Sequence, residues 1–355
     1  MSIFEETPGT PQELCETKLL KKMDLPDELL KGAIDVHAHA GPHLKSSPRR
    51  MDPIDLTIAA KAAGMRALVF MDIFENSSGT AWMINRHFDG IKTFGGIILN
   101  SIYGGMNPRA VAEALEYGDG ARFVSFGAHC TWHIARQEGN LHNGKVLPFI
   151  EYDEDFVRDE FSRAIRIPLD EAPSRELDKI LNLIAEHPQT YLMSGHVSGA
   201  EALRLCHLAK EYKINKVFIS HVAQKNMTLD EAKEAADMGA LLESTMADFC
   251  YVRGPQRFHY YVEEKYCNIN PPLPNPRGSG IEDFVSLVDT IGDDHFVVGS
   301  DYGIRGGPSP VEGMRMYIEL LLHMGVSTST ILKLTHTNAA KLLELEDPEE
   351  TAAES

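Results

Sequence analysis

Long apolar runs and secretion signals are missing from this 355-residue chain. No uninterrupted apolar stretch reaches the roughly 18 residues that a membrane-spanning helix needs, so we expect no membrane partner. The first residues, MSIFEETPGTPQEL, lack both the basic and the apolar region of a signal peptide. A cytoplasmic location is therefore the expectation.

Positive charge is scarce as well. The chain has 34 Lys and Arg residues against 52 Asp and Glu residues, for a formal net charge of −18, and no long Lys/Arg run interrupts this excess. Such a surface repels the phosphate backbones of nucleic acids and anionic lipids. We expect no nucleic-acid partner and a small-molecule substrate instead.

Cysteines are few, and their spacing indicates no pairs. There are five, an odd number, and none forms a CxxC motif. This pattern argues against a disulfide framework and against a zinc site made of thiolates.

Short apolar runs and helical segments alternate along most of the chain. Hydrophobic residues make up 43% of the sequence, enough for a large core. Segments such as DPIDLTIAAKAAG and NPRAVAEALEYG open with Asp or Asn and close on Gly, as crossover helices do. Eight candidate strands begin at Ala33, Arg66, Gly95, Arg122, Thr190, Lys216, Ala240 and His295. This alternation predicts an α/β fold with a parallel sheet, namely a (β/α)₈ TIM barrel.

The domain boundaries follow from where this rhythm begins and ends. We predict an N-terminal extension over 1–32, a barrel over 33–346 and an acidic tail over 347–355. Two connections, 130–173 and 245–280, are too long for simple turns, and loops of this length are often functional lids. The second is rich in aromatic residues, which suit either a lid over a site or a contact between subunits.

Two histidines one residue apart are the first candidate ligands. His37 and His39 lie in a predicted strand, where alternate side chains project to the same side of the pleat, so both imidazoles can hold one ion. The alternative is a pair of histidines that only make hydrogen bonds at a strand end.

Three further polar residues end other predicted strands. His196 ends the fifth strand, His221 the sixth and Asp301 the eighth. Each alone could cap a helix, but the carboxyl ends of barrel strands lie on one face, where active sites are built. The five side chains are therefore expected to converge on a divalent metal.

These motifs resemble the amidohydrolase superfamily of metal-dependent TIM-barrel hydrolases. The resemblance rests on DVHAHAGP around His37, on Gly195-His196, Ser220-His221 and Ser300-Asp301, and it extends over roughly residues 34–345. THTNAAKLLEL, from Thr335, is similar to the C-terminal helix that follows the barrel in many members. A GGIxLN third strand and a PxPVEGM-like segment indicate a poorly characterised branch.

The resemblance implies a ligand set and a mechanism. His37 and His39 would bind the metal, with His196, His221 or both, and Asp301 would be a ligand and the proton acceptor. A metal-activated water would attack the carbonyl of an amide, cyclic amide, lactone or ester. Nitrogen and carboxylate ligands favour Zn²⁺, while Mn²⁺, Fe²⁺ and Ni²⁺ also fit.

One departure concerns the number of ions. Members with two metals commonly have a lysine or carboxylate at the end of the fourth strand, but here that strand reads RFVSFGAHCTWH. One ion is therefore expected rather than a lysine-bridged pair. His129 and His133 lie just beyond and could bind the substrate, a second ion, or nothing.

Arginines and one glutamate near the predicted site could contact the substrate. Arg49, Arg50 and Arg305 fall in predicted βα connections, and arginine is well shaped to bind a carboxylate, although surface ion pairs are the plainer interpretation. Glu243, at the end of the seventh strand, is either a substrate contact or a polar rim residue. A small, carboxylated substrate would suit this group.

Two other functions stay open at this point. A metal-dependent decarboxylase of the same superfamily would use a similar His/Asp site. A non-catalytic metal-binding barrel would keep the ligands without turnover. The fold also often forms oligomers, so we expect a homo-oligomer.

Overall fold

The computed structural model describes residues 25–43, 48–128, 130–133, 164–222, 225, 227–249 and 280–346. Most of the predicted N-terminal extension, most of both long connections, the acidic tail and His129 lie outside these ranges. No helix within the described part of the chain is long and apolar enough to cross a membrane.

The strands occur where the sequence predicts them. The described strands are β1 (Ile34–Ala38), β2 (Ala67–Phe70), β3 (Lys92–Phe94), β4 (Gly96–Ile98), β5 (Phe123–Ser125), β6 (Tyr191–Met193), β7 (Val217–Ile219), β8 (Leu241–Thr245) and β9 (Phe296–Gly299). Each of the eight predicted strands has its counterpart, and β3 is an additional short strand directly before β4.

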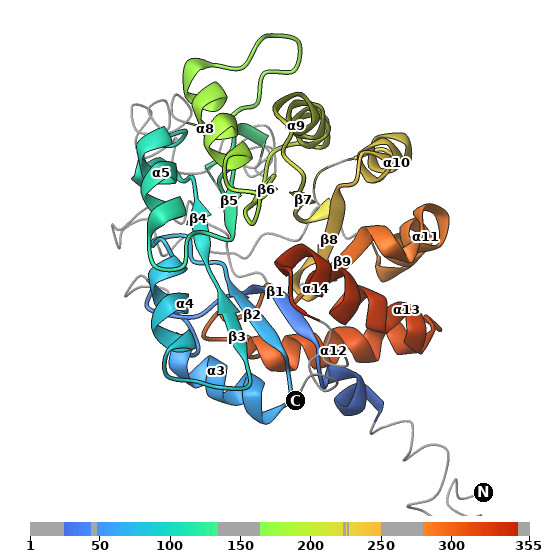
Figure 1. Cartoon of the computed structure of the whole chain (residues 1–355). Coiled ribbons are helices and arrows are strands. Elements are labelled where there is room, and N and C mark those ends of the chain that lie inside the picture. Colours follow the sequence, from blue (N-terminus) through green and yellow to red (C-terminus); the bar gives the residue numbers. More distant parts are fainter. Residues whose placement is uncertain are drawn as a thin grey trace, which may run out of the picture.

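Most of the helices lie around the outside of the strands, whereas α14 (Asn338–Leu343) lies in front of them in Figure 1. Those described are α3 (Pro53–Ala62), α4 (Ser78–Asn85), α5 (Pro108–Glu116), α8 (Arg175–Ala185), α9 (Gly199–Tyr212), α10 (Leu229–Asp237), α11 (Ile281–Ile291), α12 (Pro310–His323), α13 (Thr328–Leu332) and α14 (Asn338–Leu343). Their starts follow from local chemistry: Ser198 and Thr228 each form a capping box with a glutamate three residues later.

All strand pairs are parallel and form two sheets. One sheet has the order β1-β2-β3 and the other β4-β5-β6-β7-β8-β9. The break falls at Gly95, where a β-carbon would lie 2.2 Å from the carbonyl oxygen of Ser77. The Ser77 hydroxyl spans the junction, because it donates to Phe70 O at 2.7 Å and accepts from Gly96 N at 3.0 Å.

The first and last strands also meet through scattered hydrogen bonds. Asp301 N donates to His37 O at 2.8 Å and His39 N donates to Tyr302 O at 3.0 Å. Below them, the buried Asp35 carboxylate accepts from the Ser300 hydroxyl at 2.6 Å. The parallel α/β architecture is confirmed, but an unbroken ring of paired strands is not seen in the described residues, because the pairing is interrupted at both junctions.

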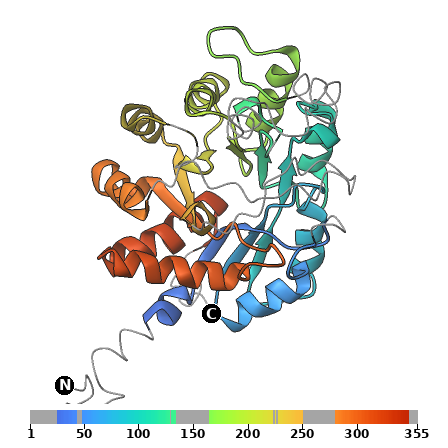
Figure 2. The same ribbon diagram turned by 180° about the vertical axis from the view of Figure 1, so that it is seen from behind.

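The core has an inner and an outer part. The outer part lies between strands and helices, and the inner part fills the space that the strands enclose. The inner part contains Ile34, Val36, Val69, Phe123, Tyr191, Phe218 and Val297. Helix α14 adds Ala339 and Leu342 to it, and this helix lies in front of the strands in Figure 1 and behind them in Figure 2. The apolar inner part therefore ends on α14 at the amino ends of the strands.

Candidate metal centre

The two histidines of β1 are placed by an irregular strand end. The pairing of β1 with β2 shifts register between Asp35 and Ala38, and the His37 and His39 rings lie 5.2 Å apart between centroids. Both residues are less than a tenth exposed. Gly299 on β9 makes room for them, since a β-carbon there would lie 2.7 Å from the His37 β-carbon.

The other candidate ligands sit at strained strand ends. His221 and Asp301 both have φ of +50°, and Gly195, just before His196, has φ of +58°. A side chain with positive φ is uncommon and costs free energy, of order 1 kcal/mol or more. The positive φ values thus fall just after β6, β7 and β9, at His221 and Asp301 themselves and at the glycine before His196.

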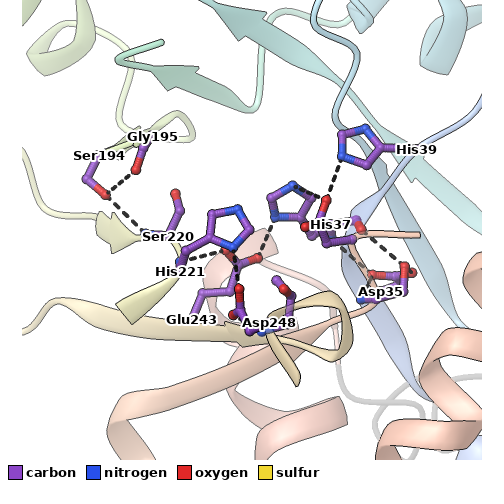
Figure 3. A network of polar contacts seen from close by, with 12 residues as sticks. Asp35, His37, His39, Ser194, Gly195, Ser220, His221, Glu243 and Asp248 are labelled. Carbon is purple, nitrogen blue, oxygen red and sulfur yellow. Dashed lines mark hydrogen bonds and ion pairs between the residues drawn. The ribbon is translucent and has the colours of Figure 1, made fainter. Parts of the chain in front are cut away.

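Figure 3 shows His37, His39 and His221 close together, and distances place Asp301 and His196 beside them. Asp301 Oδ1 lies 2.9 Å from His39 Nε2 and 3.6 Å from His37 Nε2. The ring of His221 lies 5.0 Å from that of His37 and 4.5 Å from that of His196.

Among the described residues, two sets have ligand atoms within 4.8 Å of one another. They are His37, His39 and Asp301, and His37, His221 and Glu243. His196 adjoins the second set without belonging to it. The two sets thus contain His37, His39, His221 and Asp301 of the five predicted ligands, and His37 belongs to both.

Two buried carboxylates orient the rings. His37 Nδ1 lies 2.9 Å from Glu243 Oε1, and His221 Nδ1 lies 3.2 Å from Asp248 Oδ1. An ionised carboxylate only accepts hydrogen bonds, so each Nδ1 donates one, and each Nε2 is the ring atom that remains for a cation or a second proton. This carboxylate–histidine arrangement is typical of metal ligands. The donor set of His37 and His221 therefore fits a divalent cation.

His39 is held differently. Its Nδ1 lies 3.3 Å from Arg49 Nη2, and a guanidinium can only donate. A neutral His39 that accepts this bond has its proton on Nε2 and donates it to Asp301. His39 can thus join a metal sphere only when Arg49 no longer donates to it.

The charges around His37 favour a cation. Burial alone would lower the pKa of His37, but the charge of Glu243 and its hydrogen bond, with the charges of Asp301 and Asp35, raise it from 6.5 to about 9. The pKa of His39 falls to about 4, first through burial and then through the charge of Arg49. A proton therefore occupies the position that a metal would take beside His37.

Asp301 stays anionic in this setting. Burial raises the pKa of this carboxyl, but the hydrogen bond with His39 and the charges of His37 and His221 hold it well below its usual value. Its side chain is 20% exposed, more than the histidines beside it. It is therefore both charged and reachable.

The remaining predicted residues differ in position. Glu243 is fully buried beneath the histidines, which contradicts the alternative of a polar rim residue, while a substrate contact stays a prediction. Arg50 is exposed and donates to Gly307 O at 2.8 Å, and Arg305 is exposed. His133 is half-buried at the edge of a gap in the described residues. None of these three arginine and histidine side chains belongs to the two ligand sets.

Two residues near the site escaped sequence reasoning. Asp248 lies in the single 3₁₀ turn Met246–Phe249 after β8, three residues beyond the strand. Lys225 is 2% exposed in the connection after β7. Neither residue stands at the spacing of a recognisable motif. The only indication in the sequence is that each closely follows a strand whose end carries a candidate residue.

Solved structures share the fold. An amidohydrolase from Burkholderia multivorans, determined with bound zinc, is 10% identical over 88% of this chain and 99% of its own, with a TM-score of 0.52. Amidohydrolase 2 from Bifidobacterium longum subsp. infantis is 11% identical over 88% and 99%, with a TM-score of 0.49. The predicted resemblance to the amidohydrolase superfamily is thus confirmed for the fold.

Comparison with curated proteins gives no match. A family model covers residues 32–243, more than half of the chain, and these include every candidate ligand except Asp301. The chain therefore belongs to DUF6282, a family of unknown function.

Proposed function

We propose that this chain is a metal-dependent hydrolase in which water attacks the carbonyl carbon of an amide, cyclic amide, lactone or ester, and the C–N or C–O bond to the leaving group is cleaved. One observation carries the proposal. Two buried histidines from different strands, His37 and His221, have Nδ1 fixed by carboxylates and present Nε2 to a common space beside Asp301. Such pre-orientation serves metal binding and is costly otherwise.

The ligands proposed for the ion are His37, His39 and Asp301, with His196, His221 or both. Zn²⁺ suits this nitrogen and carboxylate set, and the amidohydrolase from Burkholderia multivorans was determined with zinc. Mn²⁺, Fe²⁺ and Ni²⁺ are the alternatives. One ion is proposed, because β5 and the residues directly after it offer no lysine. A bound divalent cation would lower the pKa of a water molecule to about 7.

Each side chain then has a role in the proposal. Asp301, anionic and partly exposed, accepts the proton of the attacking water and returns it to the leaving group. His221 polarises the scissile carbonyl wherever it is not a ligand. Arg49, whose guanidinium reaches His39, binds a substrate carboxylate and would leave His39 when it does so.

The test begins with the metal. Purified protein is stripped with a chelator, reloaded with each of the four metals, and assayed against carboxylated amides, cyclic amides, lactones and esters in H₂¹⁸O. Hydrolysis puts one ¹⁸O atom into the product and requires the metal. A protein that binds no divalent cation would contradict the proposal at its first step.

A decarboxylase is the second candidate, favoured by the cation of Arg49 beside the ligands. In the same assay it would release carbon dioxide without net uptake of ¹⁸O. Stoichiometric metal with no turnover of any substrate class would favour the non-catalytic metal-binding barrel instead.

A further inference from the structure

A lysine is buried beside the candidate metal centre. Lys225 lies in the connection between β7 and α10, is 2% exposed, and is among the largest fully buried side chains. Its side-chain hydrogen bonds among the described residues go to the main chain on either side of His196.

The ammonium group of Lys225 holds the two carbonyls that flank His196. Nζ donates to Gly195 O in a short hydrogen bond and to Val197 O at 2.9 Å. The main chain of Lys225 strengthens the link, since Lys225 O accepts from Gly199 N at 2.8 Å. One side chain therefore ties the end of β6 to the loop after β7.

The peptide groups of His196 itself are fixed from a third strand. His196 N donates to Gly127 O at 3.1 Å, and His196 O accepts from the Thr131 hydroxyl at 2.6 Å. Gly195 lies so close to Gly127 that a β-carbon would come within 2.2 Å of its carbonyl oxygen. The backbone at His196 is thus held on both sides and leaves its ring little freedom beside His221.

An ammonium group is energetically unfavourable in this buried position. Burying an ammonium without partners is strongly unfavourable, and a methionine would pack here at lower cost. Burial lowers the pKa of Lys225 from 10.5 to about 7, although the charges of Glu201, Glu243 and Asp248 act to raise it. Glu243 and Asp248 are also the carboxylates that orient His37 and His221, so Lys225 belongs to the same buried group of charges.

We infer that Lys225 is a positioning residue, whose ammonium fixes the carbonyls of Gly195 and Val197 and thereby sets where the His196 imidazole stands at the metal centre. The inference rests on the proposed function, because it assigns Lys225 a purpose only if His196 serves a bound cation. The alternative is a purely structural cross-link between two loops. The two differ in what a substitution changes: the cross-link affects stability alone, whereas the positioning residue affects the metal.

Three variants of the full-length chain separate these roles. Lys225→Met removes every hydrogen-bond donor of the side chain. Lys225→Gln keeps two N–H donors without the charge, and Lys225→Arg keeps both the donors and the charge. Lys216→Met is the matched control, because Lys216 stands at the opposite end of β7 and pairs with Glu344 at 2.7 Å. The readouts are zinc affinity by competition with a chromophoric chelator, the visible spectrum of the cobalt(II)-loaded protein, and thermal unfolding of the metal-free protein.

We expect Lys225→Met to weaken zinc binding about 10- to 100-fold, as the loss of an outer partner of a metal ligand does. The cobalt spectrum should change in intensity, Lys225→Gln should be intermediate, and Lys225→Arg should restore most of the affinity. Lys216→Met should match the wild type in both metal readouts.

Unchanged zinc affinity and an unchanged cobalt spectrum in Lys225→Met would overturn the inference, even if its unfolding temperature falls. If that variant does not fold, Lys225→Gln decides by the same readouts. A wild-type protein that binds neither zinc nor cobalt would overturn the proposed function itself, and the inference with it.

Discussion

The two ends of the strands have opposite characters. At the amino ends and in the middle, side chains such as Val36 and Val297 are apolar and fully buried, and α14 covers them. At the carboxyl ends, His37 directly follows Val36 in β1 and Asp301 lies two residues beyond β9, where its φ is +50°. The apolar core and the candidate ligands are therefore separated along these two strands. Substitutions at the two ends should therefore differ in which property they change.

The largest expected effect is at Asp301. Asp301→Asn should lower kcat about 1000-fold, because the amide cannot accept the proton of the attacking water. Asparagine tolerates the positive φ of this position, so the fold and most of the bound metal should be retained. The measurement is steady-state kinetics with metal analysis of the same sample.

Val297→Ala on the same strand is the control. It should lower the free energy of unfolding by about 1–3 kcal/mol through the cavity that it creates, and leave the kcat of the metal-loaded protein unchanged. If Asp301→Asn turned over normally, Asp301 would not be the base and the contrast between the ends would fail.

The second effect is the pH dependence of the metal-free protein. The pKa of His37 is raised from 6.5 to about 9, so its contribution to stability is full below pH 6.5 and is lost as the pH rises to 9. The pKa of His39 is lowered to about 4, so its contribution is full above pH 6.5 and is lost as the pH falls to 4. Each amounts to about 3 kcal/mol.

Chemical denaturation between pH 4 and 9 measures this dependence. The combined contribution of the two histidines should be greatest near pH 6.5. In His37→Gln the loss above pH 6.5 should disappear, and a variant that keeps it would show that another group is responsible. Zinc binding to the wild type should release a proton near neutral pH, since His37 must lose one to become a ligand.

The third effect compares two glycines. Gly299→Ala puts a methyl group against the His37 β-carbon and should lower the free energy of unfolding by about 1–3 kcal/mol. It should also weaken zinc binding, because His37 must move. Gly239→Ala, at the amino end of β8, meets no atom within 4 Å and has φ of +90°. It should lower stability only, and equal zinc affinities in the two variants would contradict the predicted contact.

The smallest effect is expected at the amino ends. Glu344 pairs with Lys216 at 2.7 Å and with Arg122 at 3.6 Å, and its side chain is half exposed. Glu344→Gln should lower the free energy of unfolding by less than about 1 kcal/mol, and the difference should shrink in high salt. Denaturation at two salt concentrations measures this, and a change in zinc affinity would contradict the separation of the two ends.

The fold was predictable because apolar runs of strand length are bounded by polar residues. β3 was not, since Lys92, Thr93 and Phe94 form only a short mixed run, and the glycine after them marks a junction that is built by the distant Ser77. A side-chain hydroxyl that replaces part of the hydrogen bonding between two strands leaves no periodic pattern in the sequence. The two-sheet arrangement therefore could not be read from the pattern.

The site was predictable where ligands end strands and not where support comes from loops. His37, His39, His221 and Asp301 share one edge because parallel strands put their carboxyl ends together. The depth of Glu243 was missed, because alternation gives the side of a strand and not the distance from solvent. Lys225 resembles a surface lysine in sequence, and only the folded chain brings it to the carbonyls beside His196.

The division of the strands into two sheets has a consequence for the whole chain. His37 lies in β1 of the three-stranded sheet and His39 directly after it, while His221 and Asp301 follow β7 and β9 of the six-stranded sheet. Across the seam between first and last strands, an ion bound by all four would bridge halves of the polypeptide that are encoded far apart. A substitution that shifts one of these ligands would then also change how the first and last strands meet.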